Sequence, residues 1–157
     1  MLKALCSQIG IALEKKGLIL STAESCTGGL VAAAITDIPG SSAWFDRGFV
    51  TYSNQAKISM LGVSPATLQQ HGAVSEATAI AMAEGAQKHS SAQITLATTG
   101  IAGPDGGTDD KPVGTVCFAW AFEHQVTATI TQCFVGNRQA IRQQAVMYVL
   151  QELLANL

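Results

Sequence analysis

The sequence contains few charged residues. Only 13% of its 157 residues are Asp, Glu, Lys or Arg, compared with ~25% in typical globular domains. Hydrophobic residues make up 48%, and glycine occurs 15 times. This composition indicates a surface that is partly covered by a partner or is rich in Ala, Ser, Thr and Gln.

The chain also has no run of basic residues. Nine Lys and Arg against eleven Asp and Glu give a formal net charge of -2, whereas proteins that bind a nucleic-acid backbone usually carry a basic patch. We therefore expect no nucleic-acid partner, and a small ligand or another protein instead. No apolar stretch approaches the ~20 residues of a membrane-spanning helix, and the first residues lack a signal-peptide pattern. The expected location is the cytoplasm, with no membrane partner.

The cysteines and histidines form no metal-binding pattern. The four cysteines are far apart, no CxxC pair is present and no histidine cluster lies near them. Zinc sites use closely spaced ligands, so the sequence predicts no metal site. Reduced thiols fit this spacing best, and the three scattered histidines are expected at the surface.

Hydrophobic spacing indicates alternating helices and strands in a single domain over residues 1–157. Helices are expected over 2–16, 27–36, 54–61, 65–70, 76–88 and 137–157, and strands over 18–22, 45–52, 93–98, 114–122 and 125–135. The last two strands are close enough in sequence to form an antiparallel hairpin. Interspersed helices and strands are typical of a layered α/β domain.

A short polar segment lies where the first strand meets the next helix. Residues 22–29 read Thr-Ala-Glu-Ser-Cys-Thr-Gly-Gly, and the hydroxyl of Ser25 is expected to project at this junction. The glycines leave room for a ligand, and free N–H groups at a helix N-terminus stabilise a developing negative charge. Ser25 is therefore a candidate nucleophile. The alternative is that Ser25 or Thr27 only caps the helix, since Ser and Thr are favoured caps.

Lys57 lies near the start of the helix that follows the second strand. If Asn54 is the N-cap, Lys57 is the third helical residue, where a cation meets the positive end of the helix dipole. This position lowers the pKa of a lysine. The dipole contributes only about 0.3–1 kcal/mol, so burial must contribute most of the shift that makes lysine a base near neutral pH. The alternative is a solvated surface lysine.

Two later segments have the chemistry to bind an anion. Residues 98–114 form a glycine-rich loop between two strands, and the N–H groups of such loops bind phosphate or carboxylate; a plain connecting turn is the alternative. The loop matches neither the Walker A pattern nor GxGxxG, and its aspartates lack the order of an EF-hand. Arg138 and Arg142 are four residues apart on one helix face, which lets both contact one anionic group, unless both are solvated.

Together these segments resemble the nicotinamide-nucleotide amidohydrolase family, also called the CinA C-terminal domain family. The matching stretches are TAESCTGG at 22–29, DIPGSSAWFDRGFVTYSNQAK at 37–57, HGAVSE at 71–76, TGIAGPDGGTDDKPVGTV at 99–116 and FVGNRQAIRQQA at 134–145. The resemblance extends over nearly the whole chain, and these long stretches are far more specific than any short motif. One departure is Asn137, because family members usually have Gly-Asp-Arg where this chain has Gly-Asn-Arg.

The resemblance implies a metal-free amidase without a cofactor. Its substrate would be nicotinamide mononucleotide, hydrolysed to nicotinic acid mononucleotide and ammonia in pyridine-nucleotide salvage. The resemblance implies Ser25 as the nucleophile, Lys57 as its base and Tyr52 as a pocket residue close to them. The expected substrate-binding residues are Thr27, Gly28, Thr99, Gly100, Ala102, Gly103 and Arg138.

The resemblance further implies a three-layer α/β/α sandwich with a mixed, mostly parallel sheet, and a homodimer. Two alternatives stay open. Cys26 is intrinsically the better attacking group, and spacing does not distinguish adjacent residues. A non-catalytic nucleotide-binding or regulatory module would contain the same binding segments without turnover.

Overall fold

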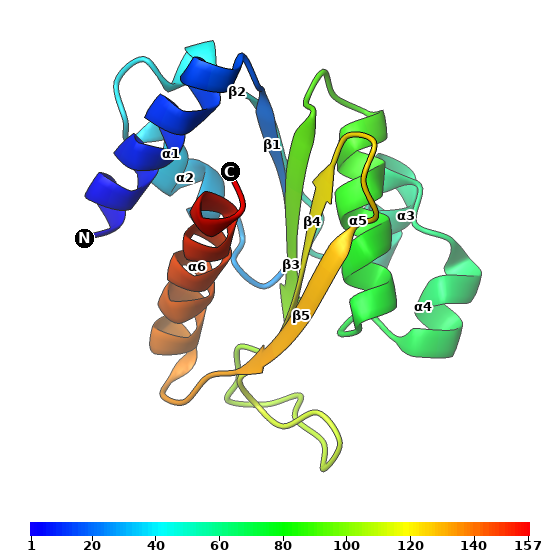
Figure 1. The fold of residues 1–157 in the computed structure, drawn as a ribbon. Helices are drawn as coiled ribbons and strands as arrows, with labels where there is room; N and C mark the ends of the chain where they lie inside the picture. Colours follow the sequence, from blue (N-terminus) through cyan, green and yellow to red (C-terminus); the bar gives the residue numbers. More distant parts are fainter.

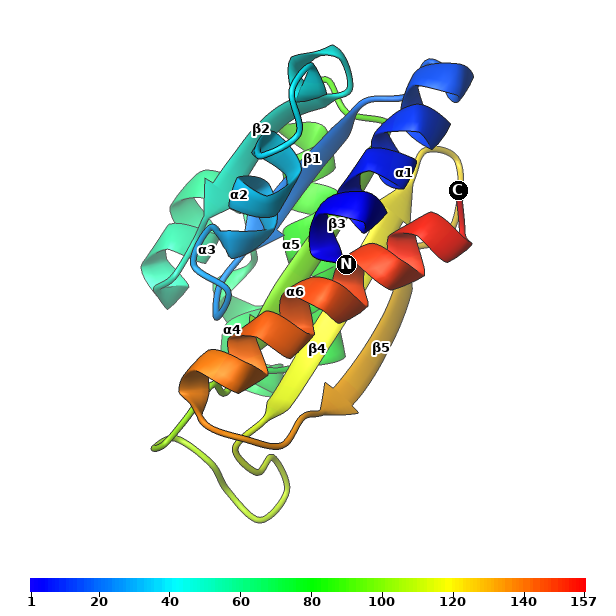
Figure 2. The ribbon, with the colours of Figure 1, turned by 90° about the vertical axis from the view of Figure 1, so that its left-hand side faces the viewer.

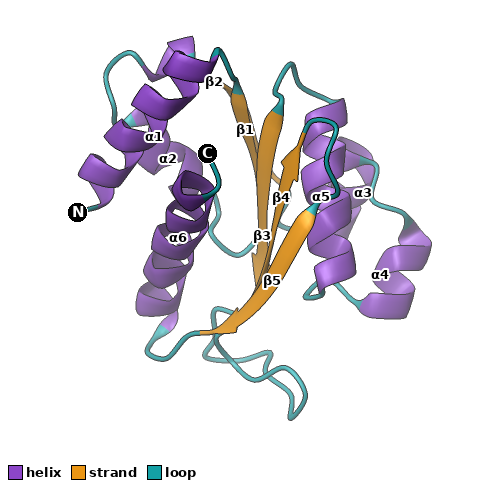
Figure 3. Ribbon diagram, in the orientation of Figure 1, coloured by secondary structure: helices purple, strands orange, loops and turns teal.

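In the computed structural model, which describes residues 1–157, helices cover both faces of one five-stranded sheet (Figure 1; Figure 3). The helices are α1 (Leu2–Lys16), α2 (Leu30–Thr36), α3 (Asn54–Leu61), α4 (Pro65–His71), α5 (Glu76–Lys88) and α6 (Arg138–Ala155). The strands are β1 (Leu20–Glu24), β2 (Phe45–Val50), β3 (Ile94–Gly100), β4 (Thr115–Phe122) and β5 (Ala128–Cys133), with a short 3-10 helix at Ser41–Ala43. The predicted α/β class is confirmed. No helix is both long and apolar enough to cross a membrane.

The strands lie in the order β2-β1-β3-β4-β5. β2, β1 and β3 are parallel, whereas β4 is antiparallel to β3 and β5 is antiparallel to β4. The predicted hairpin of the last two strands is therefore confirmed. The expectation of a mostly parallel sheet is wrong, because two of the four pairings are antiparallel. Parallel neighbours need a crossover, usually a helix, and no helix lies between β3 and β4 or between β4 and β5.

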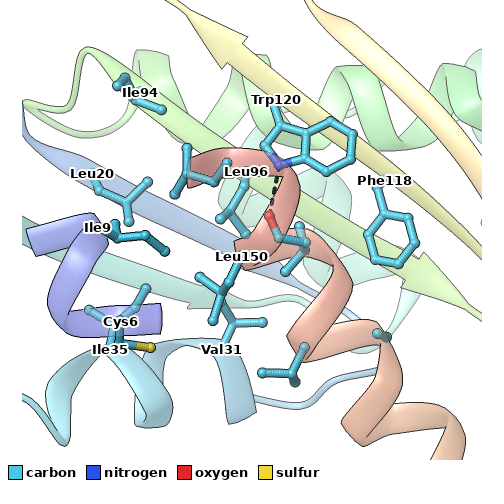
Figure 4. Close-up of a cluster of buried hydrophobic side chains, with 14 of the residues drawn as sticks. Cys6, Ile9, Leu20, Val31, Ile35, Ile94, Leu96, Phe118, Trp120 and Leu150 are labelled. Atoms are coloured by element: carbon cyan, nitrogen blue, oxygen red, sulfur yellow. Dashed lines mark hydrogen bonds between the residues drawn. The ribbon is translucent and has the colours of Figure 1, made fainter. Parts of the chain in front are cut away.

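Each face of the sheet has its own hydrophobic core. α1, α2 and α6 lie on one face, and α3, α4 and α5 lie on the other (Figure 1; Figure 2). The first core contains the fully buried Ile9, Phe118 and Leu150 (Figure 4). The second is made largely of small side chains, such as Ala83 of α5 against Ala97 of β3. Small residues let α5 lie close to the sheet.

Capping chemistry sets the ends of several helices as predicted. α1 ends at Gly17, whose left-handed backbone (φ 64°) suits a residue without a side chain. Ser75 and Asn137 are the N-caps of α5 and α6, and the side chain of each accepts a backbone N–H from the first turn. These caps fix where α5 and α6 begin relative to the sheet.

α2 begins three residues later than predicted, at Leu30 rather than Thr27. Gly28 and Gly29 have φ angles of 59° and 101°. This left-handed conformation does not continue a right-handed helix, and glycine adopts it without strain. The residues after Ser25 therefore form a turn ahead of the helix.

The three parallel strands end at one edge of the sheet. β1 leads into the Ser25 turn, β2 into residues 51–53, and β3 into the glycine-rich loop. The connection from β1 to β2 runs through α2 on one face, while the connection from β2 to β3 runs through α5 on the other (Figure 2). In open α/β sheets, ligands bind at the carboxyl ends of strands where connections diverge in this way. The fold thus brings the candidate segments together.

Candidate active site

A cavity of about 300 Å³ opens at this edge of the sheet. Its walls come from the Ser25 turn, the start of α3, the segment before α5, the glycine-rich loop and the start of α6. Eight of the ten predicted site residues line it: Ser25, Tyr52, Lys57, Thr99, Gly100, Ala102, Gly103 and Arg138. No group of three or more His, Cys, Asp or Glu side chains is arranged to hold a metal ion.

Ser25 and Lys57 contact each other inside this cavity. The Nζ of Lys57 lies 2.9 Å from the Oγ of Ser25, and the two residues are 32 positions apart in the sequence. Lys57 is only 1% exposed and Ser25 only 8%. They meet because β1 and β2 are adjacent parallel strands, and each strand leads directly into one of the two segments.

Lys57 is buried without a counter-charge. Neither ion pair of the chain involves it, and burial lowers the pKa of Lys57 from its usual 10.5, opposed only by the nearby Cys26. The Nζ also lies 2.9 Å from the carbonyl oxygen of Thr51 and 3.3 Å from that of Tyr52. As an ammonium, Nζ donates to all three oxygens; a neutral amine whose two hydrogens stay on these carbonyls would direct its lone pair at the hydroxyl of Ser25.

The start of α3 differs by one residue from the prediction. Ser53, not Asn54, is the N-cap, and its hydroxyl accepts the N–H of Ala56 at 3.0 Å. Lys57 is therefore the fourth helical residue rather than the third, and burial is the leading cause of its lowered pKa. Asn54 is left to line the cavity. Ser and Asn are equally favoured caps, so the sequence does not show which of the adjacent Ser53 and Asn54 begins α3.

Cys26 lies beside Ser25 but its thiol is not activated. Burial raises the pKa of the Cys26 thiol to about 12, and Glu24 adds to this, while its own nearby backbone N–H, Arg142 and Lys57 act in the opposite direction. The thiolate is the nucleophilic form of cysteine, and Lys57 is hydrogen-bonded to Ser25 instead. The structure therefore favours Ser25 as the attacking group.

Glu24, rather than Ser25 or Thr27, accepts the free N–H groups at the N-terminus of α2. Its buried carboxylate accepts the hydroxyl of Thr27 at 2.6 Å. It also accepts three backbone N–H groups, those of Gly29, Val31 and Ala32, at 2.9 to 3.2 Å. The capping alternative for Ser25 is therefore wrong, and its hydroxyl is available for chemistry. A glutamate so far ahead of a helix is not a recognised capping pattern, so the sequence did not reveal it.

Thr27 and Gly28 do not line the cavity, although both are predicted to bind substrate. Thr27 is fully buried, and its hydroxyl oxygen lies 2.7 Å from that of Thr98 on β3. Gly28 faces Arg142, because a Cβ at this position would lie 3.1 Å from the guanidinium. Their placement supports the turn that carries Ser25, and not a contact with substrate.

The two arginines of α6 have separate roles. Arg138 lines the cavity and joins two of its walls, donating to the carbonyl oxygen of Gly103 at 2.8 Å and to the hydroxyl of Tyr52 at 2.9 Å. Tyr52 is 61% exposed and lies at the mouth. Arg142 instead donates to main-chain carbonyls of the Ser25 turn. The expectation that both arginines contact one anion is therefore wrong.

The glycine-rich loop presents free N–H groups to the cavity. Ala102, Gly103, Asp105 and Gly106 all line it, and none of their N–H groups makes a hydrogen bond within the chain. The loop therefore has the donors that an anion requires. The hydroxyl of Thr99 is already used, since it donates to the carbonyl oxygen of Ala73 at 2.8 Å.

Several residues that line the cavity could not be predicted from the sequence. Ala73 and Val74 belong to the short segment before α5, and apolar residues outside a motif carry no chemical signature. Ile101, Asp105 and Gly106 lie in a loop whose anion-binding character is predicted, but the course of a long loop does not follow from its composition.

A buried serine hydroxyl beside a lysine whose pKa is lowered by burial is the arrangement of a nucleophilic site, and comparison with known proteins identifies the family. Residues 2–157 match the CinA C-terminal domain. The chain is 56% identical to the Nicotinamide-nucleotide amidohydrolase PncC of Escherichia coli, over 97% of this chain and 92% of that protein. It is 53% identical to a Putative competence-damage inducible protein of Symbiobacterium thermophilum, over 90% of this chain but 35% of that longer protein. The chain belongs to the CinA C-terminal domain family.

Solved structures have the same fold. The competence/damage inducible protein CihA from Agrobacterium tumefaciens matches with a TM-score of 0.95 and 46% identity, over 98% of this chain and 94% of that chain. A competence-damaged protein (CinA) superfamily protein from Escherichia coli matches with a TM-score of 0.96 and 39% identity, over 100% and 91%.

Proposed function

We propose that this chain is a nicotinamide-nucleotide amidohydrolase that converts nicotinamide mononucleotide into nicotinic acid mononucleotide and ammonia, in pyridine-nucleotide salvage. The identity of 56% with PncC over 97% of the chain supports the substrate. The observation that carries the chemistry is the 2.9 Å contact between a buried, unpaired lysine amine and the hydroxyl of Ser25.

The first step forms an acyl-enzyme. Neutral Lys57 accepts the proton of Ser25 while Oγ attacks the carboxamide carbon. Backbone N–H groups of the Ser25 turn stabilise the oxyanion. Lys57 then gives its proton to the amide nitrogen, the carbon–nitrogen bond breaks, and ammonia leaves.

The second step regenerates the enzyme. Lys57 takes a proton from water, and the resulting hydroxide attacks the acyl carbon. The bond from this carbon to Oγ breaks, and Ser25 recovers its proton from Lys57. The product is a carboxylic acid, which releases its proton to solvent at neutral pH and leaves as the carboxylate; no metal or cofactor takes part in either step.

Substrate orientation follows from the charges around the cavity. The carboxamide lies at Ser25, and the anionic phosphate lies toward Arg138 and the free N–H groups of residues 102–106. Arg138 is held in place by Tyr52 and Gly103, and a guanidinium so fixed loses little freedom when it binds phosphate. Thr99 and Gly100 form the wall between these two ends.

The remaining proposals concern the whole protein. Residues 1–157 would act as one domain, in the cytoplasm, and as a homodimer. Light scattering that detects only monomer-sized particles would contradict the dimer.

Ammonia release from nicotinamide mononucleotide tests the function directly. Ser25→Ala and Lys57→Met should each lower turnover by roughly 10³-fold or more, and a chelator should have no effect. The exposed Ser42 and Lys88 provide matched controls, because Ser42→Ala and Lys88→Met should retain full turnover. Near wild-type turnover in either dyad variant would exclude the dyad. Substrate binding without ammonia release by the wild-type protein would indicate a non-catalytic nucleotide-binding module instead.

A further inference from the structure

The turn that carries Ser25 has most of its backbone groups occupied. The N–H of Ser25 donates to the carbonyl of Thr98 at 2.9 Å, and the carbonyl of Ser25 accepts the N–H of Gly28 at 3.0 Å. The N–H of Gly29 donates to Glu24 at 3.2 Å. Buried backbone groups are almost always paired in folded proteins, so the groups left without a partner are informative.

Two N–H groups of this turn make no hydrogen bond within the chain, those of Cys26 and Thr27. They directly follow Ser25 in the sequence, and Cys26 lines the cavity. The N–H of the residue after a nucleophile is a recurrent oxyanion donor. The turn thus leaves free, at Cys26, a donor that a developing oxyanion needs.

Arg142 binds two carbonyls of the same turn. Its Nε lies 3.0 Å from the carbonyl oxygen of Cys26, and its Nη2 lies 3.2 Å from that of Thr27. These carbonyls belong to the two peptide units that follow Cys26, so the bonds fix the turn directly after the residue that lines the cavity. The planar fork of a guanidinium spans two adjacent carbonyls, whereas a lysine amine does not reproduce this geometry.

Gly28 makes room for this arginine. A Cβ at position 28 would lie 3.1 Å from Nη2 of Arg142, and the φ of +59° is itself unfavourable for other residues. The sequence separation between Arg142 and Cys26 is 116 residues, so the contact exists only because α6 packs beside the Ser25 turn.

We propose that Arg142 is a positioning residue for the oxyanion donor. By holding the carbonyls of Cys26 and Thr27, it fixes the turn directly after Cys26 and so keeps the N–H of Cys26 aligned with the carboxamide oxygen as negative charge develops there. Arg142 does not line the cavity, so it acts on the reaction through the turn and not by contact with substrate. The inference rests on the proposed role of Ser25 as nucleophile.

Steady-state kinetics separate this role from substrate binding. Arg142→Lys and Arg142→Gln should lower kcat for nicotinamide mononucleotide by roughly 10- to 100-fold, because misaligned donors stabilise the transition state less. KM should stay within about twofold, since no ground-state contact is lost. A raised KM with unchanged kcat would show that Arg142 binds the substrate anion, and would overturn the proposal.

A second measurement does not depend on the substrate. An alkyl fluorophosphonate should react with Ser25: the Oγ–phosphorus bond forms, the phosphorus–fluorine bond breaks, fluoride leaves and Lys57 takes the proton. The phosphoryl oxygen then occupies the oxyanion position. Arg142→Lys should slow this labelling by a factor similar to its loss in kcat, while the final extent of labelling reports the folded fraction.

Arg47 offers a matched control. It also donates to a main-chain carbonyl, that of His89, at 3.2 Å on the surface. Arg47→Lys should therefore change neither kcat nor the labelling rate. If Arg142→Lys is labelled at the wild-type rate, Arg142 has only a structural role and the inference is overturned. If the wild-type protein is labelled at Ser25 but releases no ammonia, the proposed function fails while the labelling comparison still tests Arg142.

Discussion

Lys57 combines two properties that rarely occur together in one side chain. It is a lysine with 1% exposure, and no carboxylate pairs with it. Fully buried lysines are almost always paired, because an isolated buried ammonium is costly. Burial therefore shifts Lys57 toward the neutral amine that the proposed chemistry needs.

The rate of ammonia release should depend on the protonation of Lys57. Burial lowers the pKa of this amine below 10.5, and the neutral form is the active one. The value of kcat/KM should therefore rise with pH and reach a plateau below pH 10.5. A pH profile of initial rates checks this, and a rate that falls steadily from neutral to alkaline pH would contradict it.

Replacement of Cys26 should leave the chemistry intact. The thiol has a pKa of about 12, so it is protonated at neutral pH and is a poor nucleophile. We expect Cys26→Ser to retain ammonia release within about threefold, because the alcohol is close in size and does not alter the backbone donors of the turn. A loss as deep as that of Ser25→Ala would instead make the thiol the attacking group.

Among the secondary-structure elements, α6 connects the two sides of the site. Its first turn carries Arg138 into the cavity, and its second carries Arg142 onto the Ser25 turn. Asn137 begins the helix, and its side-chain oxygen accepts the N–H of Ala140 at 2.9 Å. The cap therefore determines where both arginines lie.

Asn137 allows this cap to be tested. Asn137→Ala should lower the free energy of unfolding by about 1 kcal/mol. Asn137→Asp should keep the full stability, because Asp is an equally good cap and a carboxylate favours the positive end of a helix. Urea denaturation of the three proteins checks this, and equal stability of the Ala and Asp variants would contradict it.

The order of the elements could be predicted because hydrophobic spacing and caps are local signals. Ser75 and Asn137 place the starts of α5 and α6 correctly for this reason. The start of α2 could not be predicted, since it depends on the left-handed backbone of Gly28 and Gly29. The contact of Arg142 with residues far away in the sequence leaves no local pattern.

At the scale of the whole molecule, the buried lysine of the site lowers the stability of the fold. Lys57 is buried in a place where its charged form is disfavoured, so below pH 10.5 it must either give up the proton that it keeps in the unfolded chain or remain charged without a partner. Each alternative lowers the free energy of unfolding, whereas a hydrophobic side chain at this position would not. This cost is coupled to pH.

The sign of this coupling leads to a stability prediction. Because the folded pKa of Lys57 is lowered from 10.5, the unfolded chain binds more protons between those two pKa values, and stability rises with pH across that window. The cost is fully present below the folded pKa and vanishes above 10.5.

Lys57→Met removes this titration. The free energy of unfolding of the wild-type protein should therefore increase relative to Lys57→Met as the pH is raised from about 6 to about 10. Urea denaturation across this range measures the difference. Lys88→Met, at an exposed position, should show no such trend, and a constant difference for Lys57→Met would contradict the prediction.

The positions of the four free thiols allow partial unfolding of the protein to be followed through their reactivity. Cys133 is exposed, whereas Cys6, Cys26 and Cys117 are buried. Cys6 belongs to the core under α1, and Cys117 to the core under α5. A thiol-modifying reagent should thus react at once with Cys133, and with Cys6 and Cys117 only as the helical layer over each of them detaches. Mass spectrometry of the modified peptides over time would show which face of the sheet opens first, without any engineered label.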